Sequence, residues 1–393
     1  MQSQAQPKTA IPFWRDERVL KILGQVAFAA ALILLGSIIF QNMKTGLAKQ
    51  GITVSLSFLK GISGFDIGEY AFPYDRNSTY WQAYLVGLVN TLNVSLVGVL
   101  FATLFGIILG VARLSTNFII NRLAVFYLEL VRNLSLLVFL VFWYLAVFLK
   151  LPRMKDAIFW PGDIILTNRG VGIPWGIPTA SHPTFRLILL GGLILALIVF
   201  LALRAYGKRS GRAPLTLLWS LLTFSVVAAA GWLLLPEKPL MLDVPFVKGL
   251  NLSGGKILSP EFMALTSGLV LYTSAFIGEV VRAGIQSVSK GQVEASRALG
   301  LNGFQTLRLI VFPQAMRVII PPLTSQYLNL IKNSSLAIAV GYPDVFYVSN
   351  TIQNQTGRAV EMISMVMATY LLFSLITSAL MNWYNQRIKL VER

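Results

Sequence analysis

Cysteine is absent from the 393 residues, which excludes disulfide bonds, a thiolate nucleophile and a cysteine-ligated metal. His182 is the only histidine. It lies beside Pro183 in a polar segment, so we interpret it as a loop residue, and a metal site of several histidines is excluded. The sequence also lacks a Gly-x-x-x-x-Gly-Lys-Ser/Thr segment, because the nearest approach, Gly207–Ser210, has no preceding glycine frame. The chain therefore has no phosphate-binding loop of its own.

Charged residues are scarce, and acidic ones are scarcer than basic ones. Only 12% of residues are charged, whereas 55% are hydrophobic and the mean hydropathy is +0.67. This composition is typical of a polytopic membrane protein. The formal net charge is +17, yet no basic stretch is interleaved with aromatic residues on a polar background, so we expect no nucleic-acid partner. Attraction to anionic lipid and the enrichment of cations in cytoplasmic loops account for the charge.

Long apolar runs predict an all-α polytopic membrane protein with about eight transmembrane helices. The runs are about Val19–Phe40, Tyr84–Ala112, Leu123–Leu149, Leu187–Leu203, Leu215–Leu235, Phe262–Val281, Met316–Ile338 and Ile363–Tyr384. The fourth run is barely long enough to cross a bilayer. The segments 41–81, 150–184 and 236–260 are predicted to be external loops. Basic residues near both ends and between the fourth and fifth runs place both termini in the cytoplasm.

Two of these runs carry features that bear on packing. Ala102, Gly106 and Gly110 recur every four residues in the second run, a spacing that lets another helix approach closely, although small residues are also common in membrane helices generally. Pro321 and Pro322 lie early in the seventh run. Prolines free backbone carbonyl groups that neighbours must satisfy, so we expect this helix to be bent and internal.

The segment Glu294–Pro313, EASRALGLNGFQTLRLIVFP, is polar and basic and lies between two apolar runs. Good helix formers from Gln292 to Leu299 precede Gly300, which is placed for a left-handed helix cap. Asn302 and Gly303 then predict a turn, and Phe304–Phe312 predicts a second short helix that Pro313 ends. We therefore expect a helical hairpin that a second protein can grip.

The spacing within this hairpin is similar to that of a known family. Glu294-Ala295, Gly300, Ile310 and Pro313 resemble the EAA loop of ATP-binding-cassette (ABC) importer permeases. The flanking segments 277–300 and 313–336 resemble the polar amino-acid uptake branch, and the long chain is similar to the Q-type permease subunit of general L-amino-acid uptake systems. Ser296 stands where a second alanine is usual, and Phe312 stands where leucine is usual.

The resemblance implies a five-helix permease core that is interrupted by an insertion. Residues 1–80 hold an N-terminal tail, an extra transmembrane helix and an external loop. Residues 81–150 match the first two core helices, residues 151–261 form the insertion with two extra helices, and residues 262–393 hold the last three core helices. The coupling loop spans 283–313 within this last part.

The same resemblance implies how such a chain is driven. Glu294, Ala295, Ala298, Gly300, Ile310 and Pro313 are the residues that would couple the chain to an ATPase. The implied partners are two ATPase subunits, a second and different permease chain, and a periplasmic binding protein that delivers amino acids. ATP and magnesium would bind to the ATPase, so this chain would hold no cofactor and would not be an enzyme. The implied location is the bacterial inner membrane.

A zwitterionic amino acid needs both an anionic and a cationic partner within a low-dielectric path. The polar residues of the predicted spans that we name as candidates are Glu129, Arg132, Glu279, Gln326, Asn329, Lys332 and Asn333. Glu129 and Arg132 also lie on one helical face, where they can neutralise each other. Asn133-Leu134-Ser135 follows Arg132 where the family usually has Gly-Thr-Pro, so the resemblance carries no kink over to this position.

Other function classes compete on the residues alone. A secondary amino-acid transporter needs no ATPase, but such transporters often show inverted repeats or twin broken helices, which we do not detect. A channel or a membrane enzyme fits the composition, yet no zinc-type cluster or catalytic dyad lies in a span. A non-transporting structural membrane subunit is the alternative that the sequence excludes least.

Overall fold

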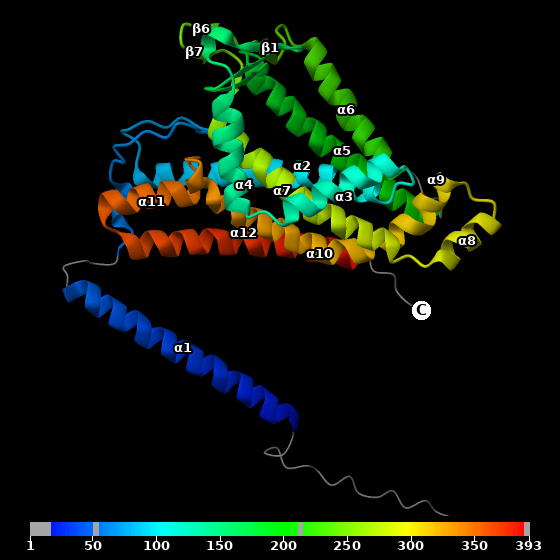
Figure 1. Ribbon diagram of the computed structural model, residues 1–393, viewed down its shortest axis with the longest axis horizontal. Coiled ribbons are helices and arrows are strands. Elements are labelled where there is room, and N and C mark those ends of the chain that lie inside the picture. The colour runs from blue at the N-terminus through cyan, green and yellow to red at the C-terminus, as the bar shows by residue number, and fades with distance from the viewer. Residues whose placement is uncertain (1–16, 50–54, 211–214, 389–393) are drawn as a thin grey trace, which may run out of the picture.

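The computed structural model describes residues 17–49, 55–210 and 215–388 (Figure 1). The predicted N-terminal tail and the last C-terminal cations, Lys389 and Arg393, lie outside these ranges. The α-helices are α1 (Glu17–Lys49), α2 (Tyr80–Arg113), α3 (Phe118–Arg132), α4 (Leu136–Phe142), α5 (His182–Ser210), α6 (Thr216–Leu234), α7 (Pro260–Gln286), α8 (Lys290–Ala298), α9 (Gly303–Thr306), α10 (Phe312–Asn333), α11 (Val345–Thr356) and α12 (Ala359–Ile388).

The described chain contains seven helices that are long and apolar enough to cross a membrane, and an eighth candidate that is broken. The prediction of about eight spans is thereby confirmed. The broken candidate is the third predicted run, which the structure divides into Phe118–Arg132 and Leu136–Lys150 at an angle of 106°. The expectation of one unbroken helix over Leu123–Leu149 is therefore wrong.

The break between α3 and α4 is made without the glycine and proline that the family usually carries. Asn133 caps α3, and its side-chain amide donates a hydrogen bond to the carbonyl oxygen of Glu129 over 2.7 Å. Ser135 then adopts an extended conformation, with φ −69° and ψ 131°, before α4 begins. Asparagine and serine favour helix caps because their short side chains compete for backbone hydrogen bonds, and this accounts for the break between α3 and α4.

Helix α7 lies at the centre of the helical body and packs against α2, α3, α4 and α10. The close approach predicted for the second run is confirmed at its contact with α7. Ala102, Gly106 and Gly110 are buried. A Cβ atom on Gly106 would lie 2.5 Å from Cγ2 of Ile277, and one on Gly110 would lie 2.7 Å from the carbonyl oxygen of Gly278. These glycines are therefore required by packing.

Helix α10 runs without interruption through Pro321 and Pro322, which are both exposed. A π-helix, Leu307–Val311, precedes α10, and a 3-10 turn, Ser334–Ala339, follows it, so the irregular windings lie at its two ends. Ile320 and Leu323 on α10 are buried. The prediction that this span is internal therefore holds only for the face that packs against α7 and α12, because a third of its most apolar part is buried and both prolines are exposed. The expected bend stays a prediction.

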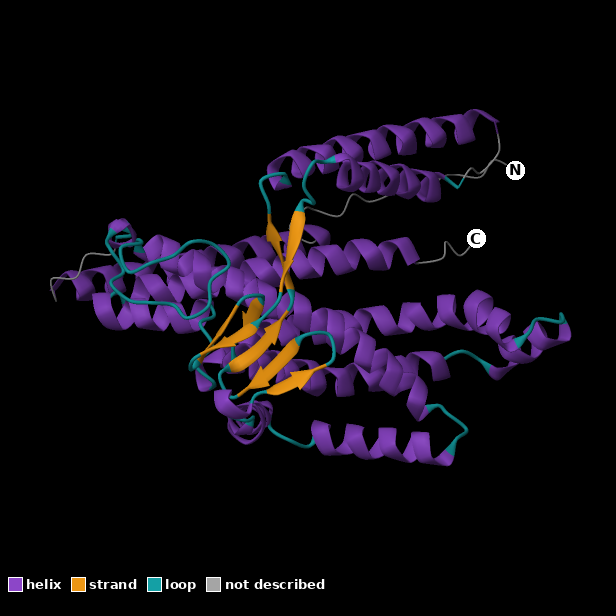
Figure 2. Cartoon of the chain, turned by 90° about the horizontal axis from the view of Figure 1, so that it is seen from above, coloured by secondary structure: helices purple, strands orange, loops and turns teal. Residues whose placement is uncertain are grey.

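The segments 150–184 and 236–260 were expected to be loops, but they contain eight short β-strands. The strands are β1 (Ile158–Trp160), β2 (Ile164–Thr167), β3 (Gly170–Ile173), β4 (Trp175–Pro178), β5 (Leu240–Asp243), β6 (Phe246–Lys248), β7 (Asn251–Ser253) and β8 (Lys256–Leu258). An antiparallel sheet has the order β1-β2-β3-β8, and Val171 pairs with Leu258 across its last two strands. Figure 2 shows these strands gathered in one group.

The insertion also carries two helices on a β-ribbon. Strands β4 and β5 pair with each other, β4 leads into α5, and β5 follows α6. Helices α5 and α6 lie side by side (Figure 1). Gly192 on α5 and Gly231 on α6 allow their close contact, because added Cβ atoms would lie 2.9 and 2.8 Å from Val227 and Ile188.

Helix α11 was not predicted from the sequence. Asp344 caps its N-terminus, and Gly357, with φ +68°, ends it. Its buried face consists of Val345, Val348 and Ile352, which pack against α2 and α12. Asp344 and Gly357 lie thirteen positions apart in the sequence, and this pair of cap residues is the signal from which the helix could have been predicted. Figure 1 places α11 at one end of the helical body and the α8–α9 hairpin at the other.

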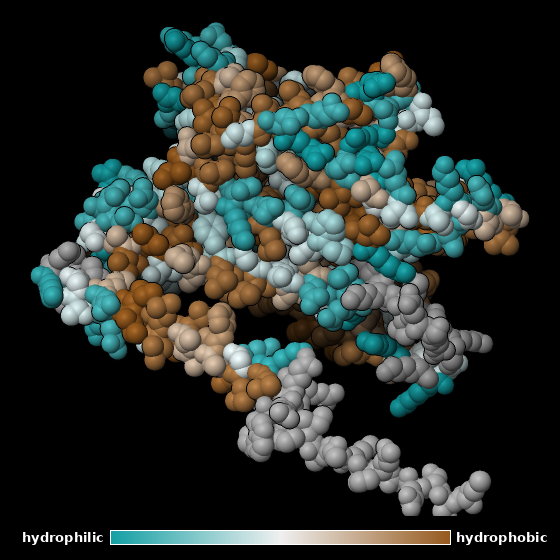
Figure 3. Space-filling view, turned by 60° about the horizontal axis from the view of Figure 1, so that its bottom comes forward, coloured by the Kyte–Doolittle hydropathy of each residue, from teal (hydrophilic) through white to brown (hydrophobic). Residues whose placement is uncertain are grey.

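Apolar side chains remain exposed along the long helices. Figure 3 shows them covering much of the helical body. Helix α1 stands apart from the other helices in Figure 1, and its most apolar part has no buried residue. Such surfaces are suited to contact with lipid or with other membrane helices.

Candidate functional site

The predicted hairpin is present and its turn has the predicted cap. Helix α8 ends at Ala298, and Gly300 adopts φ +80°, a left-handed conformation that glycine enters at little cost. The amide of Gly300 donates to the carbonyl oxygen of Arg297, and the amide of Leu301 donates to that of Ser296, over 2.9 and 3.1 Å. These hydrogen bonds satisfy the last carbonyl groups of α8 and fix the direction of the turn.

The second helix of the hairpin begins with a capping box. The side chain of Asn302 accepts a hydrogen bond from the amide of Gln305 over 2.9 Å, and the side chain of Gln305 accepts one from the amide of Asn302, also over 2.9 Å. This reciprocal pair satisfies backbone donors at the start of α9. The turn from Gly300 to Asn302 is therefore defined from both sides.

The predicted end of this second helix at Pro313 is wrong. Pro313 occupies the first turn of α10, and the span Gly303–Ala339 is helical throughout. The π-helix Leu307–Val311 directly before α10 interrupts the usual hydrogen-bond ladder, and a helix accommodates proline at such an irregular winding. The hairpin is thus joined to the membrane helix α10 by continuous helix, through the half-buried Ile310 and the π-helix.

A buried hydrogen bond joins the two arms of the hairpin. Ser296 and Thr306 are 2% and 5% exposed, and their hydroxyl oxygens lie 2.9 Å apart. Ser296 is the residue that stands where the family usually has a second alanine. Serine at position 296, in place of the usual alanine, therefore adds a polar contact between the arms. The sequence analysis assigned no role to its partner, Thr306.

The outer face of the hairpin presents both predicted residues and apolar residues that the prediction missed. Glu294, Ala295, Ala298 and Gly300 are all exposed. Beside them, Leu299 is 81% exposed and Phe304 is 70% exposed. Two large apolar side chains at the tip of a polar hairpin form an anchor of the kind found at protein interfaces. Both residues flank the Gly300 turn, so the sequence alone could have indicated their position beside it.

A charge cluster lies near the end of α7, the helix that leads into the hairpin. Glu279 on α7 accepts hydrogen bonds from Nε of Arg282, over 3.1 Å, and from a guanidinium nitrogen of Arg113 at the end of α2. Arg282 also donates to Gln286. Both oxygens of the Glu279 carboxylate are therefore held by arginines, which tie α2 to α7 beside the hairpin.

The remaining path candidates lie in two groups. Glu129 and Arg132 are exposed on α3, and the guanidinium of Arg132 lies 5.7 Å from the ring centre of Phe276, one turn from Glu279. The second group lies on the later half of α10 and consists of Gln326, Asn329, Lys332 and Asn333. No hydrogen bond or ion pair within the described ranges joins the two groups, so their role in a path remains a prediction.

Metal ligation is not indicated at these positions. Among the residues that the structure describes, no group of three or more His, Asp or Glu side chains is arranged to hold a metal ion. The described site consists of exposed apolar side chains on the hairpin and two arginines linked through Glu279.

Comparison with known proteins places this geometry in context. The permease protein YhdX of Escherichia coli (strain K12) is 42% identical over 375 residues, which cover 94% of each chain. The general L-amino acid transport system permease protein AapQ of Rhizobium johnstonii is 40% identical over 365 residues, covering 92% of this chain and 91% of the relative. A solved amino acid ABC transporter with histidines aligns over 78% of this chain with a TM-score of 0.46 and 20% identity.

A family model matches about three quarters of the chain. Residues 102–390 match the binding-protein-dependent transport system inner membrane component. This range includes the last third of α2, the whole insertion, the hairpin and all later helices. The chain therefore belongs to the family of inner membrane components of binding-protein-dependent transport systems.

Proposed function

We propose that this chain is a permease subunit of an ATP-driven importer of amino acids. The observation that carries the proposal is the exposed, doubly capped hairpin, which continues as unbroken helix into the membrane span α10. A rigid element of this kind transmits movement of a bound partner to the span. The names of AapQ and of the glutamate/glutamine/aspartate/asparagine permease BztB of Rhodobacter capsulatus, which is 37% identical over 406 residues, support amino acids as the substrate class.

The partner of the hairpin is a separate ATPase subunit that binds ATP and magnesium. Leu299 and Phe304 insert into a groove of the ATPase, and the exposed Glu294 pairs with a cation there. This is recognition of a helix in a groove, in which a few apolar anchors dominate the affinity. Closure of two ATPase subunits then moves the hairpins, and α10 moves with them as a rigid body.

The importer has further partners. A second, different permease chain supplies the other half of the path, and an external binding protein delivers the amino acid. The hairpin and both termini lie in the cytoplasm of a bacterial cell, and the end of the helical body that carries α11 faces outward. Anionic lipid of the inner leaflet attracts the basic residues near the hairpin.

Co-purification with the ATPase tests the coupling role. Leu299→Ser and Phe304→Ser should each reduce recovery of the ATPase with the permease by about tenfold or more, because truncation of an interface anchor typically costs about 2 kcal/mol. Phe118→Ser is the matched control, since Phe118 is 71% exposed but lies at the start of α3. Equal recovery for all three variants would contradict the proposal.

Uptake in proteoliposomes tests the transport role. The assembled complex should accumulate labelled amino acids only when ATP and the binding protein are present. Uptake that an ion gradient drives without ATP would identify a secondary transporter instead. Absence of uptake of any amino acid by an intact complex would support a structural membrane subunit.

A further inference from the structure

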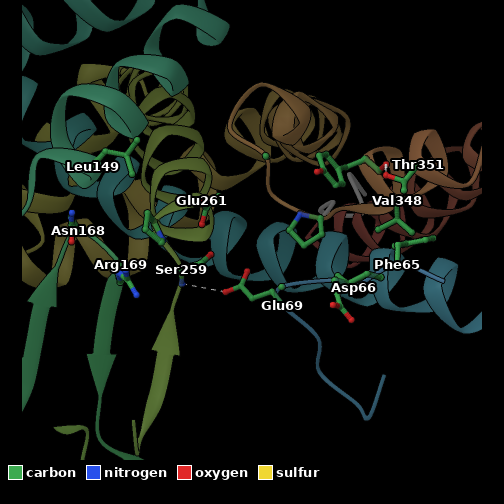
Figure 4. A pocket seen from close by; sticks show the side chains of 16 residues that line it. Phe65, Asp66, Glu69, Leu149, Asn168, Arg169, Ser259, Glu261, Val348 and Thr351 are labelled. Atoms are coloured by element: carbon green, nitrogen blue, oxygen red, sulfur yellow. Dashed lines mark hydrogen bonds between the residues drawn. The ribbon is translucent and has the colours of Figure 1, made fainter. Parts of the chain in front are cut away.

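A cavity of about 600 Å³ lies at the end of the helical body that carries α11 (Figure 4). Five segments that are distant in sequence line it: the loop 65–69, Leu149 after α4, the β2–β3 turn, the start of α7, and α11 with the residues just before it. Pockets of this size accommodate small polar ligands. None of the path candidates named from the sequence lines this cavity.

Glu69 lines the cavity, and its carboxylate is incompletely satisfied. Its Oε1 accepts a hydrogen bond from the amide of Ser259 over 3.3 Å, which Figure 4 marks with a dashed line. Its Oε2 is buried and has no hydrogen-bond partner among the described residues. The backbone of Glu69 is fixed as well, because its carbonyl oxygen accepts from the side-chain amide of Asn90 over 2.8 Å. A buried carboxylate oxygen without a partner is costly unless a ligand supplies one.

A second carboxylate shares the cavity. Glu261, in the first turn of α7, accepts a hydrogen bond from the hydroxyl of Tyr144 over 3.0 Å. Burial raises the pKa of Glu69 to about 7, and the nearby charge of Glu261 raises this pKa as well. Two carboxyl groups in one cavity disfavour each other's charge, and a cation placed between them relieves the repulsion.

The cavity also contains a cation. Arg169 in the β2–β3 turn lines the cavity, is exposed, and donates from Nη1 to Oδ1 of Asn251 over 2.6 Å. A guanidinium has five N–H donors, so others remain for a carboxylate ligand. The third acid of the cavity, Asp66, is already paired, because Nε of Arg76 donates to its carboxylate over 2.6 Å. In Figure 4, Asp66 points away from Glu69 and Glu261.

We propose that this cavity binds the zwitterion of an α-amino acid, with its ammonium group between Glu69 and Glu261 and its carboxylate at Arg169. This inference rests on the proposed function, and it adds an outer entry site at which the amino acid is held before it reaches the membrane spans. Recognition is of the amino and carboxylate groups, so amino acids with different neutral side chains share the site.

The absence of cysteine from this chain allows a direct test on the assembled complex. Thr351→Cys places one thiol on the cavity wall, and its rate of labelling by a methanethiosulfonate reports occupancy. L-glutamine is the probe, with glutaramate, which lacks the amino group, and L-glutaminamide, which lacks the carboxylate, as matched comparisons. L-glutamine should slow labelling in a saturable manner, whereas each comparison compound should need about tenfold or more higher concentration.

Two acidic residues of the same cavity provide the variant and its control. Glu69→Gln retains the acceptor for the amide of Ser259 but removes the charge, and it should weaken protection by L-glutamine about tenfold or more. Asp66→Asn should leave protection unchanged, since its carboxylate faces Arg76 on the exposed surface. A saturating effect of L-glutamine that glutaramate reproduces, or that Glu69→Gln leaves intact, would overturn the proposal, as would no protection by L-glutamine at all.

Uptake separates the two proposals. The Thr351→Cys complex that takes up amino acids with ATP but shows no protection by L-glutamine would disprove the entry site alone. A complex that binds L-glutamine in the cavity but accumulates no amino acid with ATP would leave the entry site standing and contradict the proposed function.

Discussion

The hydroxyl oxygens of Ser296 and Thr306 lie 2.9 Å apart in the buried seam of the hairpin. The Ser296 hydroxyl also donates to the carbonyl oxygen of Val293 over 2.7 Å. Because a hydroxyl has one hydrogen, Thr306 is the donor in the bond between the arms and Ser296 is the acceptor. This bond connects α8 to the helix that continues into α10, so it helps the hairpin to move as one body.

Replacing Thr306 by valine removes this donor while retaining the shape of the side chain. We expect Thr306→Val to lower the local stability of the hairpin by about 1 kcal/mol, because the buried Ser296 oxygen loses its partner. Thr306→Ser keeps the hydroxyl and is the control. Hydrogen exchange of the α8 and α9 amides measures the effect, and equal protection in the two variants would show that the bond contributes nothing.

The two glycines of the hairpin turn should respond differently to alanine. Gly300 adopts φ +80°, whereas Gly303 is the first residue of α9, and an added Cβ has no neighbour within 4 Å at either position. Gly300→Ala should therefore cost about 1 kcal/mol of backbone strain, and Gly303→Ala should be neutral or stabilising. Recovery of the ATPase with each variant, together with hydrogen exchange of the turn, measures this. A larger loss for Gly303→Ala would contradict the assigned turn geometry.

These two turn positions also indicate how far the sequence can be interpreted. The left-handed cap at Gly300 and the small-residue stripe at Gly106 and Gly110 depend on local spacing, so they could be predicted. The pairing of Val171 with Leu258 in β3 and β8 joins segments on either side of two membrane helices, and the short strands carry no clear alternation. Pairings of such high sequence separation are specified by packing rather than by local pattern.

The hairpin and the cavity around Glu69 also differ in how far the sequence predicts them. The exposed face of α8 follows from a linear motif, but the cavity around Glu69 requires five segments to meet. Nothing near Glu69 in the sequence distinguishes it from Asp66. In the structure, one carboxylate oxygen of Glu69 is buried, whereas the carboxylate of Asp66 is paired with Arg76. Burial of a single carboxylate oxygen is a tertiary property, and for this reason sequence reasoning missed the residue.

The contact of α2 with α7 predicts a strong effect of side-chain size at Gly110. Gly110→Val places methyl groups where the carbonyl oxygen of Gly278 and the side chain of Val281 already lie, within 2.8 Å of an added Cβ. We expect a loss of about 1–3 kcal/mol, which is typical of overpacking. Gly36→Val on α1 is the control, because an added Cβ there has no neighbour within 4 Å. Thermal unfolding in detergent compares them, and equal midpoints would contradict this packing.

The charge cluster predicts whether Glu279 is a structural or a path residue. Glu279→Gln leaves Arg113 and Arg282 facing each other without their shared anion, each about a quarter exposed. We expect a loss of about 2 kcal/mol in stability, discounted for solvent screening. Combining it with Arg113→Gln should restore part of that loss, since one uncompensated cation is removed. Unchanged stability with an altered KM for uptake would instead place Glu279 in the path.

The raised pKa of Glu69 predicts the direction of one pH dependence. Folding shifts this pKa from a usual value of 4.5 to about 7, chiefly by burial. The folded protein thus binds the proton more tightly than the unfolded chain does, and stability falls as pH rises from about 4.5 through about 7. The loss attributable to Glu69 is at most about 3.5 kcal/mol, from about 1.4 kcal/mol for each unit of pKa change.

Other groups around Glu69 titrate or carry charge, so the test uses a difference. Glu261 on α7 and Lys256 on β8 act on the Glu69 charge, and burial also raises the pKa of Asp344, to about 6. The difference in unfolding midpoint between wild type and Glu69→Gln, measured across this pH range, isolates the Glu69 contribution. Wild type should lose stability relative to the variant as pH rises, and L-glutamine should reduce this loss because an ammonium group favours the charged carboxylate. A difference that stays constant with pH would show that Glu69 ionises in the folded protein as it does in water.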